Sequence, residues 1–235
     1  MNIDQETKKP VYNEPLQRQR WEHEPGSMYA HAIAAFASLA VWIVLIIQSA
    51  PLGARHLIGS AVFGFSLVFL YSMSTIYHLM PAHMPRAKRW MHRMDHFGIF
   101  VLIAGTYTPI CLTVLAGWLG WSLLFIEWAS AATGITLKMS GVSLPRWMPA
   151  ALYAGMGWLG IVAIMPLLRE LGSMGVIWLL VGGFWYTIGI LFFALGEFYP
   201  KRIGGRWLGM HEIFHVCVMF GSAAHVYLIW RYVLT

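Results

Sequence analysis

The last apolar segment of this 235-residue chain begins with His211-Glu212-Ile213-Phe214-His215. Histidines four apart on a helix lie on the same face, about 6 Å apart along the axis, so both imidazoles can reach one metal ion. An isolated pair of this kind more often donates hydrogen bonds to neighbouring helices. The placement of other polar residues must decide between these two interpretations.

Two other apolar segments carry polar residues near one of their ends. The second ends with Ser74-Thr75-Ile76-Tyr77-His78, and the third begins with Met94-Asp95. If successive segments cross a membrane in alternating directions, the end of the second and the starts of the third and seventh share one surface, within roughly 10 Å of the boundary. A carboxylate inside a membrane costs about 2.5–3.5 kcal/mol and is usually retained for a partner or a function. The shared depth therefore favours a metal site.

We predict His78, His211 and His215 as the metal ligands, with Asp95 either holding a metal-bound water or acting as a fourth ligand. Three imidazoles with an open fourth position are typical of catalytic zinc sites, so zinc is the expected metal. Zinc lowers the pKa of a bound water toward about 7, and Asp95 could take its proton, as in metal-assisted hydrolysis. Ser74 lies one turn before His78, where its hydroxyl can bond to the water, a ligand or a substrate oxygen, or to its own helix backbone.

Three further polar residues lie inside apolar segments. His225 shares a helix face with His211 but lies about 21 Å farther along the axis, so we expect it to line an internal cavity or to pack as a hydrogen-bonded histidine. His31 opens the first segment and is expected at the rim of the site. Glu127, midway along the fourth segment, is either a proton relay or substrate contact, or a protonated structural residue.

The composition, 58% hydrophobic and 11% charged, together with apolar blocks of about twenty residues, predicts an all-α integral membrane protein. We expect a polar cytoplasmic leader over residues 1–27 and a single transmembrane domain over 28–235, built as a bundle of seven helices. The predicted helices are Met28–Ala50, Leu57–Leu79, Met94–Ala116, Trp118–Leu137, Trp147–Leu168, Gly175–Leu195 and Leu208–Val233. Membrane-spanning strands are excluded because segments of this length without alternation fit helices.

The basic residues predict the orientation of the chain. Thirteen of the sixteen lysines and arginines fall in the leader and the second, fourth and sixth connections, and the other three are Arg55, Arg169 and Arg231. This bias predicts a cytoplasmic N-terminus and a C-terminus outside. The net charge of +6 therefore reflects membrane topology and implies no nucleic-acid partner. Cys111 and Cys217 lie inside apolar segments and are expected to be small apolar fillers.

The pattern Ser74-x-x-x-His78, then Asp95, then His211-x-x-x-His215, resembles the hemolysin III family, bacterial relatives of the progestin and adipoQ receptors and of alkaline ceramidases. The resemblance covers nearly the whole chain from the first helix. It implies seven helices, zinc held by the residues that match the three histidines, and supporting roles for Asp95 and Ser74. It also implies a link to membrane lipid and energetic homeostasis. The chain departs from the family pattern at His31-Ala32, where bacterial relatives usually have His-Gly.

Three functions are compatible with these residues. We expect an intramembrane, zinc-dependent hydrolase of a lipid-derived amide or ester, with membrane lipids as substrate or ligand, in the bacterial inner (plasma) membrane. The alternative is a receptor-like regulator in which zinc is structural, because the same residues serve both. A pore-forming haemolysin fits less well, since a secreted pore-former should be soluble before it inserts. The oligomeric state does not follow from the sequence.

Overall fold

The computed structural model describes residues 25–81, 83–115, 117–140, 145, 147–198, 202–204 and 208–234. The predicted leader, residues 1–27, therefore lies outside the described residues except for its last three, which already belong to a helix. Helices account for nearly all of the described chain, and this confirms the all-helical class.

The helices follow one another along the chain with short connections. The long ones are α2 (Pro25–Ser49), α3 (Ala54–Leu79), α4 (Pro85–Pro109), α5 (Trp118–Met139), α6 (Met148–Trp158), α7 (Ile164–Phe198) and α8 (Met210–Leu228). The short ones are η1 (Ala50–Leu52), η2 (Ile110–Val114), η3 (Leu159–Ala163) and η4 (Ile229–Val233), of which η2 and η4 are π turns. Two short antiparallel strands, β1 (Arg202–Gly204) and β2 (Leu208–Gly209), precede α8 where the sequence predicted only helix and connection.

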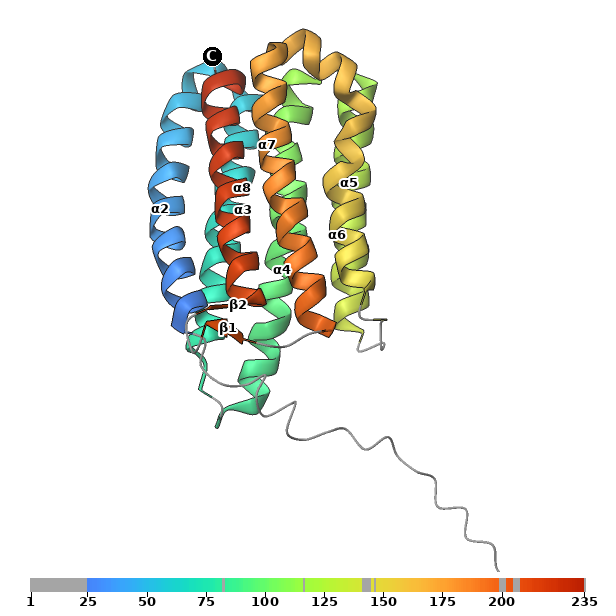
Figure 1. Cartoon of the computed structure of the whole chain (residues 1–235). Helices are drawn as coiled ribbons and strands as arrows, with labels where there is room; N and C mark the ends of the chain where they lie inside the picture. The colour runs from blue at the N-terminus through green and yellow to red at the C-terminus, as the bar shows by residue number, and fades with distance from the viewer. Residues whose placement is uncertain are drawn as a thin grey trace, which may run out of the picture.

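The long helices run side by side along one axis and form a bundle (Figure 1). Helix α2 packs on α3, α3 on α4, and α7 on α8. The strands and the start of α8 lie at the lower end of the bundle in this view, while the C-terminus lies at the upper end. The end of α3 and the start of α8 therefore meet at one end of the bundle, where the sequence predicts the metal ligands.

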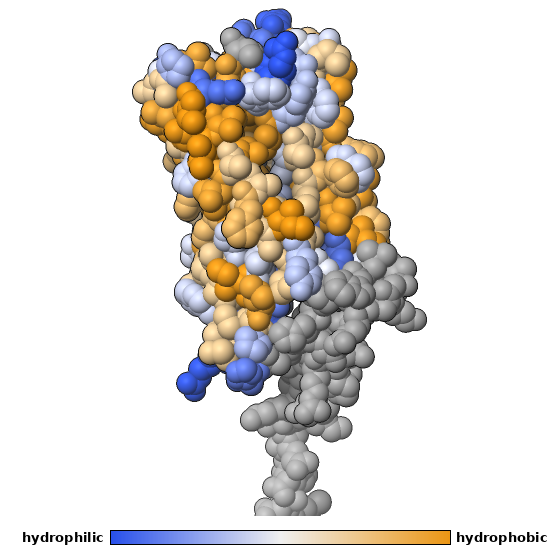
Figure 2. All heavy atoms as spheres, turned by 90° about the vertical axis from the view of Figure 1, so that its left-hand side faces the viewer, coloured by the Kyte–Doolittle hydropathy of each residue, from blue (hydrophilic) through white to orange (hydrophobic). Residues whose placement is uncertain are grey.

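The outer surface of the bundle is apolar. On the face that carries α2, hydrophobic residues cover most of the middle, and hydrophilic residues gather toward the ends (Figure 2). Phe36 and Ile33 on α2 are 78% and 68% exposed. A surface with many exposed apolar side chains suits contact with lipid, because large contiguous apolar patches are unfavourable in water.

Among the described residues, five helical segments are long and apolar enough to cross a membrane: Gly26–Leu52, Ala54–Leu79, Pro85–Val114, Met148–Gly196 and Met210–Val233. The chain is therefore an integral membrane protein. The segment from Met148 contains a break, because Gly172 has φ 69° and ψ 175°, a left-handed conformation that favours glycine.

Helix α4 starts nine residues before the predicted third helix. Pro85 occupies its first turn, where a proline is compatible with helical geometry. The four basic residues assigned to the second connection, Arg86, Lys88, Arg89 and Arg93, therefore lie on the helix. Hydropathy alone misses this extension, because a helix continues into the polar region after its apolar stretch has ended. Lys88 is also buried, with 3% of its surface exposed.

Candidate metal centre

The three histidines predicted as metal ligands come together at the end of α3 and the start of α8. One ring nitrogen from each of His78, His211 and His215 lies within 4.8 Å of the other two. The ring centroids are 5.1 Å apart for His78 and His215, and 4.3 Å apart for His211 and His215. His78 and His215 are buried, and His211 is half-buried. We call this group the histidine cluster.

A hydrogen bond between α3 and α8 sets the relative height of the two helices. The Tyr71 hydroxyl donates to Ser222 Oγ at 2.7 Å. Tyr71 comes seven residues before His78, and Ser222 comes seven residues after His215. Since the helices run in opposite directions, this bond lies about 10 Å from the cluster on both helices and brings their histidines to one level.

The histidine cluster could hold a metal ion. His215 Nδ1 is buried and has no hydrogen-bond partner among the described residues, and such an atom costs free energy inside a membrane unless something binds it. Zinc–nitrogen bonds are about 2.0–2.1 Å long, so nitrogens that share one zinc ion lie closer together than the 4.8 Å limit, and the three rings must move toward one another to bind it. The donor set, imidazole nitrogen alone, suits zinc, copper, iron and nickel.

The other two predicted site residues lie outside the group of mutually close donor atoms. Asp95 is buried on the first half of α4, yet its carboxylate is not one of the atoms within 4.8 Å of each other. Ser74 is fully buried on α3, one turn before His78, and its hydroxyl has no hydrogen-bond partner among the described residues. Among the described residues, Ser74 therefore does not form the alternative hydrogen bond to the backbone of its own helix.

His31 contacts the cluster more closely than a residue at its rim. Its ring stacks on that of His215, with centroids 3.8 Å apart and an interplanar angle of 12°, and it meets Tyr71 edge-on at 5.0 Å. A histidine on the first helix was the only available signal in the sequence, since stacking depends on how α2 is rotated. A second group that the sequence did not suggest lies beside His78: the rings of Tyr77 and His92 are 5.2 Å apart, and Lys88 Nζ is 5.8 Å from the Tyr77 centroid.

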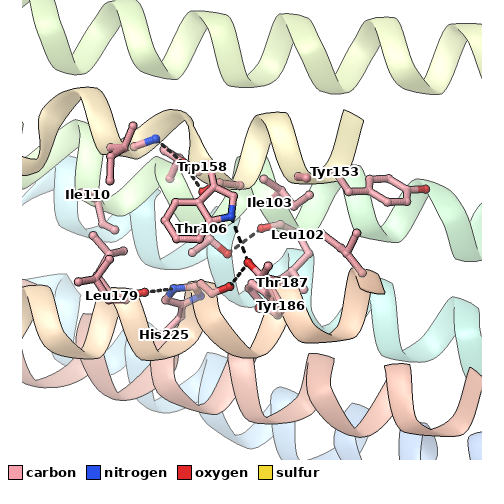
Figure 3. A pocket seen from close by; sticks show the side chains of 18 of the residues that line it. Leu102, Ile103, Thr106, Ile110, Tyr153, Trp158, Leu179, Tyr186, Thr187 and His225 are labelled. Atoms are coloured by element: carbon pink, nitrogen blue, oxygen red, sulfur yellow. Dashed lines mark hydrogen bonds between the residues drawn. The ribbon is translucent and has the colours of Figure 1, made fainter. Parts of the chain in front are cut away.

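An apolar chamber of about 120 Å³ lies between α4, α6, α7 and α8 (Figure 3). Phe214, which lines it, is in ring contact with His211 at 5.9 Å and with His215 at 5.5 Å. The chamber therefore reaches to within one side chain of the histidine cluster.

The chamber wall also carries polar side chains. His225 lines it, as predicted, and its Nε2 donates to the Leu179 carbonyl at 3.3 Å. A neutral His225 ring that donates from Nε2 keeps Nδ1 as an acceptor. On the same wall, the Trp158 indole donates to Thr187 Oγ1 at 3.1 Å (Figure 3).

Apolar helices around a buried imidazole cluster define an integral membrane protein with a site that could bind a metal ion. Residues 19–226 match the family described as Haemolysin-III related, and the chain belongs to that family. It is 38% identical over 216 residues to Hemolysin-3 of Bacillus cereus, covering 91% of this chain and 93% of that protein. Identity to the Hemolysin-3 homolog of Bacillus subtilis (strain 168) is 35% over 212 residues, covering 90% and 94%. Identity to the human Monocyte to macrophage differentiation factor is 24% over 212 residues, covering 87% and 84%.

Proposed function

We propose that this chain is a zinc-dependent hydrolase that cleaves a lipid-derived amide or ester inside the membrane. The observation that carries the proposal is the contact of Phe214 with both the histidine cluster and the apolar chamber. A lipid has the same two parts, a polar linkage that can be cleaved and an apolar tail. The chamber would hold the tail, and the cluster would face the linkage.

Zinc is the proposed metal because three imidazoles with a free coordination position are typical of catalytic zinc sites. Zinc bound by His78, His211 and His215 would polarise a carbonyl oxygen and lower the pKa of a bound water to about 7. His31 holds the His215 ring in place by stacking on it. This packing fixes one ligand before the substrate arrives, which favours catalysis because little reorganisation is then needed.

Asp95 and Ser74 have the proposed supporting roles. Asp95, buried on α4, would accept the proton that the attacking water loses and later return it to the leaving group. The Ser74 hydroxyl, which has no partner among the described residues, would donate to the substrate oxygen. Each role requires the side chain to approach the cluster when substrate binds, and catalytic hydrogen bonds often tighten only in the substrate complex.

We further propose seven membrane crossings. The break at Gly172 divides Met148–Gly196 into two helices, and α5, with 22 residues, is long enough to cross although it is not among the five apolar segments. In Figure 1 the start of α2 and the C-terminus lie at opposite ends of the bundle, which supports an odd number of crossings. Together with the thirteen basic residues of the leader and of the second, fourth and sixth predicted connections, this favours a cytoplasmic N-terminus and an external C-terminus.

The membrane in question is proposed to be the bacterial cytoplasmic membrane, since two of the relatives come from Bacillus species. The histidine cluster would then face its inner leaflet. Membrane lipids are the expected substrates or ligands, and a role in membrane lipid and energetic homeostasis follows from the proposed reaction.

The substitution Asp95→Asn tests the hydrolase. Asparagine is nearly isosteric but cannot accept a proton, so turnover should fall by at least about a hundredfold while zinc content and melting temperature stay close to wild type. The measurement is lipid mass spectrometry of the purified protein in liposomes, with and without chelator, beside zinc analysis. A variant that loses zinc and thermal stability together, with no turnover by the wild type, would instead favour the receptor with structural zinc.

A further inference from the structure

Glu127 is buried in the middle of α5 and belongs to no part of the proposed metal centre. Its exposed surface is 0%, and neither carboxyl oxygen has a hydrogen-bond partner among the described residues. It lies nine residues, or about 14 Å, from the first residue of a 22-residue helix. Burying a carboxyl group in this position costs free energy whether the group is charged or neutral. Its presence therefore indicates that it binds a ligand.

Among the residues that the structure describes, none places a cation beside Glu127 that could stabilise a carboxylate. Helix α5 packs against α4, η2, α6 and η3. Tyr107 on α4 and Cys111 on η2 are the ionisable side chains that the charge of Glu127 influences. The ionisable side chain of α6 is Tyr153, whose hydroxyl donates toward the His96 carbonyl, and η3 contains none. A charge on Glu127 would thus be unpaired, whereas a proton makes the group neutral.

The helix opposite Glu127 is irregular. Pro109 lies within α4, and the chain continues directly into the π turn Ile110–Val114, which packs on α5. Threonines around the proline bond to carbonyls one turn earlier: Thr108 Oγ1 donates to Ala104, and Thr113 Oγ1 donates to Pro109. Single π turns are frequent at functional sites.

The apolar chamber lies close to the carboxyl group. Leu123, one turn before Glu127 on the same helix face, lines the apolar chamber, and so does Tyr107. The chamber, about 120 Å³, has the volume for several water molecules, and polar groups on its wall, such as His225 Nδ1, can hydrogen-bond to them. Only the wall formed by these side chains separates Glu127 from a space that water could enter.

We propose that Glu127 is a proton-binding site within the membrane, separate from the histidine cluster, and that it exchanges its proton through the apolar chamber. The equilibrium is simple: the carboxylic acid releases one proton to water in the chamber and becomes a carboxylate. The charged form, which has no cation beside it, would draw water toward the π turn. Binding of the proton and packing of α5 on η2 are therefore coupled.

Infrared difference spectroscopy on the full chain in liposomes tests the proposal. The carbonyl stretch of a protonated carboxylic acid should be present near neutral pH, absent in Glu127→Gln, and lost reversibly when the pH is raised, with one proton released per chain. The matched control is Glu170→Gln, which removes an exposed glutamate and should leave this band unchanged. Chelation of the bound metal should also leave the band unchanged, because the two sites are separate.

A hydrophobic carbodiimide gives a second readout, since it adds across a protonated carboxyl group to form an acylisourea without a leaving group. Wild-type protein should gain one adduct, mapped to Glu127 by mass spectrometry, and labelling should fall as the pH rises. An infrared band that persists at every pH would overturn the proposal, because it would describe a structural acid that does not exchange. A band absent at neutral pH, or labelling prevented by sodium ions at constant pH, would also overturn it, the latter in favour of a metal-cation site.

Discussion

Ser60 and Ser74 lie on the same helix in similar surroundings but at different depths in the bundle. Both are fully buried, and neither hydroxyl has a hydrogen-bond partner among the described residues. Ser74 precedes His78 by one turn, whereas Ser60 lies fourteen residues from Ser74, or about 21 Å along α3. Ser74 alone is thus placed to donate to a substrate at the histidine cluster.

Replacing Ser74 by Ala should lower lipid turnover roughly 10- to 100-fold, because one hydrogen bond to the reacting oxygen is lost. Ser60→Ala is the matched control and should leave turnover unchanged. Both variants should melt at the wild-type temperature or slightly above it, since an unpartnered buried hydroxyl is removed in each. Equal loss of turnover in the two variants would contradict the role assigned to Ser74.

The histidine cluster could be predicted from the sequence because it depends on residue spacing within a helix and on distance from the helix end. Spacing by four residues places His211 and His215 on one face of α8, and counting residues from the ends of the apolar segments brings His78 to the same depth. The contact of His31 with His215 could not be predicted in this detail, because it depends on the rotation of α2 about its own axis and on its packing against α8. The distance of Asp95 from the cluster depends in the same way on the position of α4.

At the scale of the helices, a glycine lets α4 approach α3. A Cβ atom added at Gly98 would lie 2.8 Å from the Leu70 Cα, closer than such atoms approach in proteins. Backbone cannot move aside as a flexible side chain can. Gly98 therefore sets the separation of the two helices that carry Asp95 and His78.

Gly98→Ala should destabilise the protein by about 1–3 kcal/mol, because α3 and α4 must separate to admit the methyl group. Gly155→Ala on α6 is the control: no atom lies within 4 Å of the added Cβ, so the change should stabilise the helix by up to about 1 kcal/mol. Thermal unfolding of both variants in detergent provides the comparison. A Gly98→Ala variant as stable as Gly155→Ala would show that the two helices are not held at this distance.

Helix boundaries were predictable where the apolar stretch ends at the membrane surface and less so elsewhere. Helix α3 ends at Leu79, as predicted, where Met80 takes an extended conformation. Helix α4 begins at Pro85, well before its apolar part, because a proline in the first turn suits helical geometry and hydropathy does not register it. The π turn after Pro109 could not be predicted from hydropathy either. A proline predicts that the helix is irregular but does not say which kind of irregularity it has.

For the molecule as a whole, the distribution of basic residues predicts which side of the membrane each terminus faces. Thirteen of sixteen lysines and arginines belong to the leader and the even-numbered connections of the predicted topology. A reporter that is active only outside the cytoplasm should therefore work when fused to the C-terminus, and one that needs the cytoplasm should work at the N-terminus. Activity of a cytoplasmic reporter at the C-terminus would contradict the orientation and would remove the cluster from the inner leaflet.

The central claim is that three histidines from two helices far apart in the sequence form one metal site. Elemental analysis of purified wild-type protein should find about one zinc ion per chain, since three imidazoles in one cluster bind one ion. His211→Ala should lose most of this zinc, because only two imidazoles remain, whereas His225→Ala on the same helix should keep it. Full zinc content in the single alanine variants of His78, His211 and His215 would contradict the account.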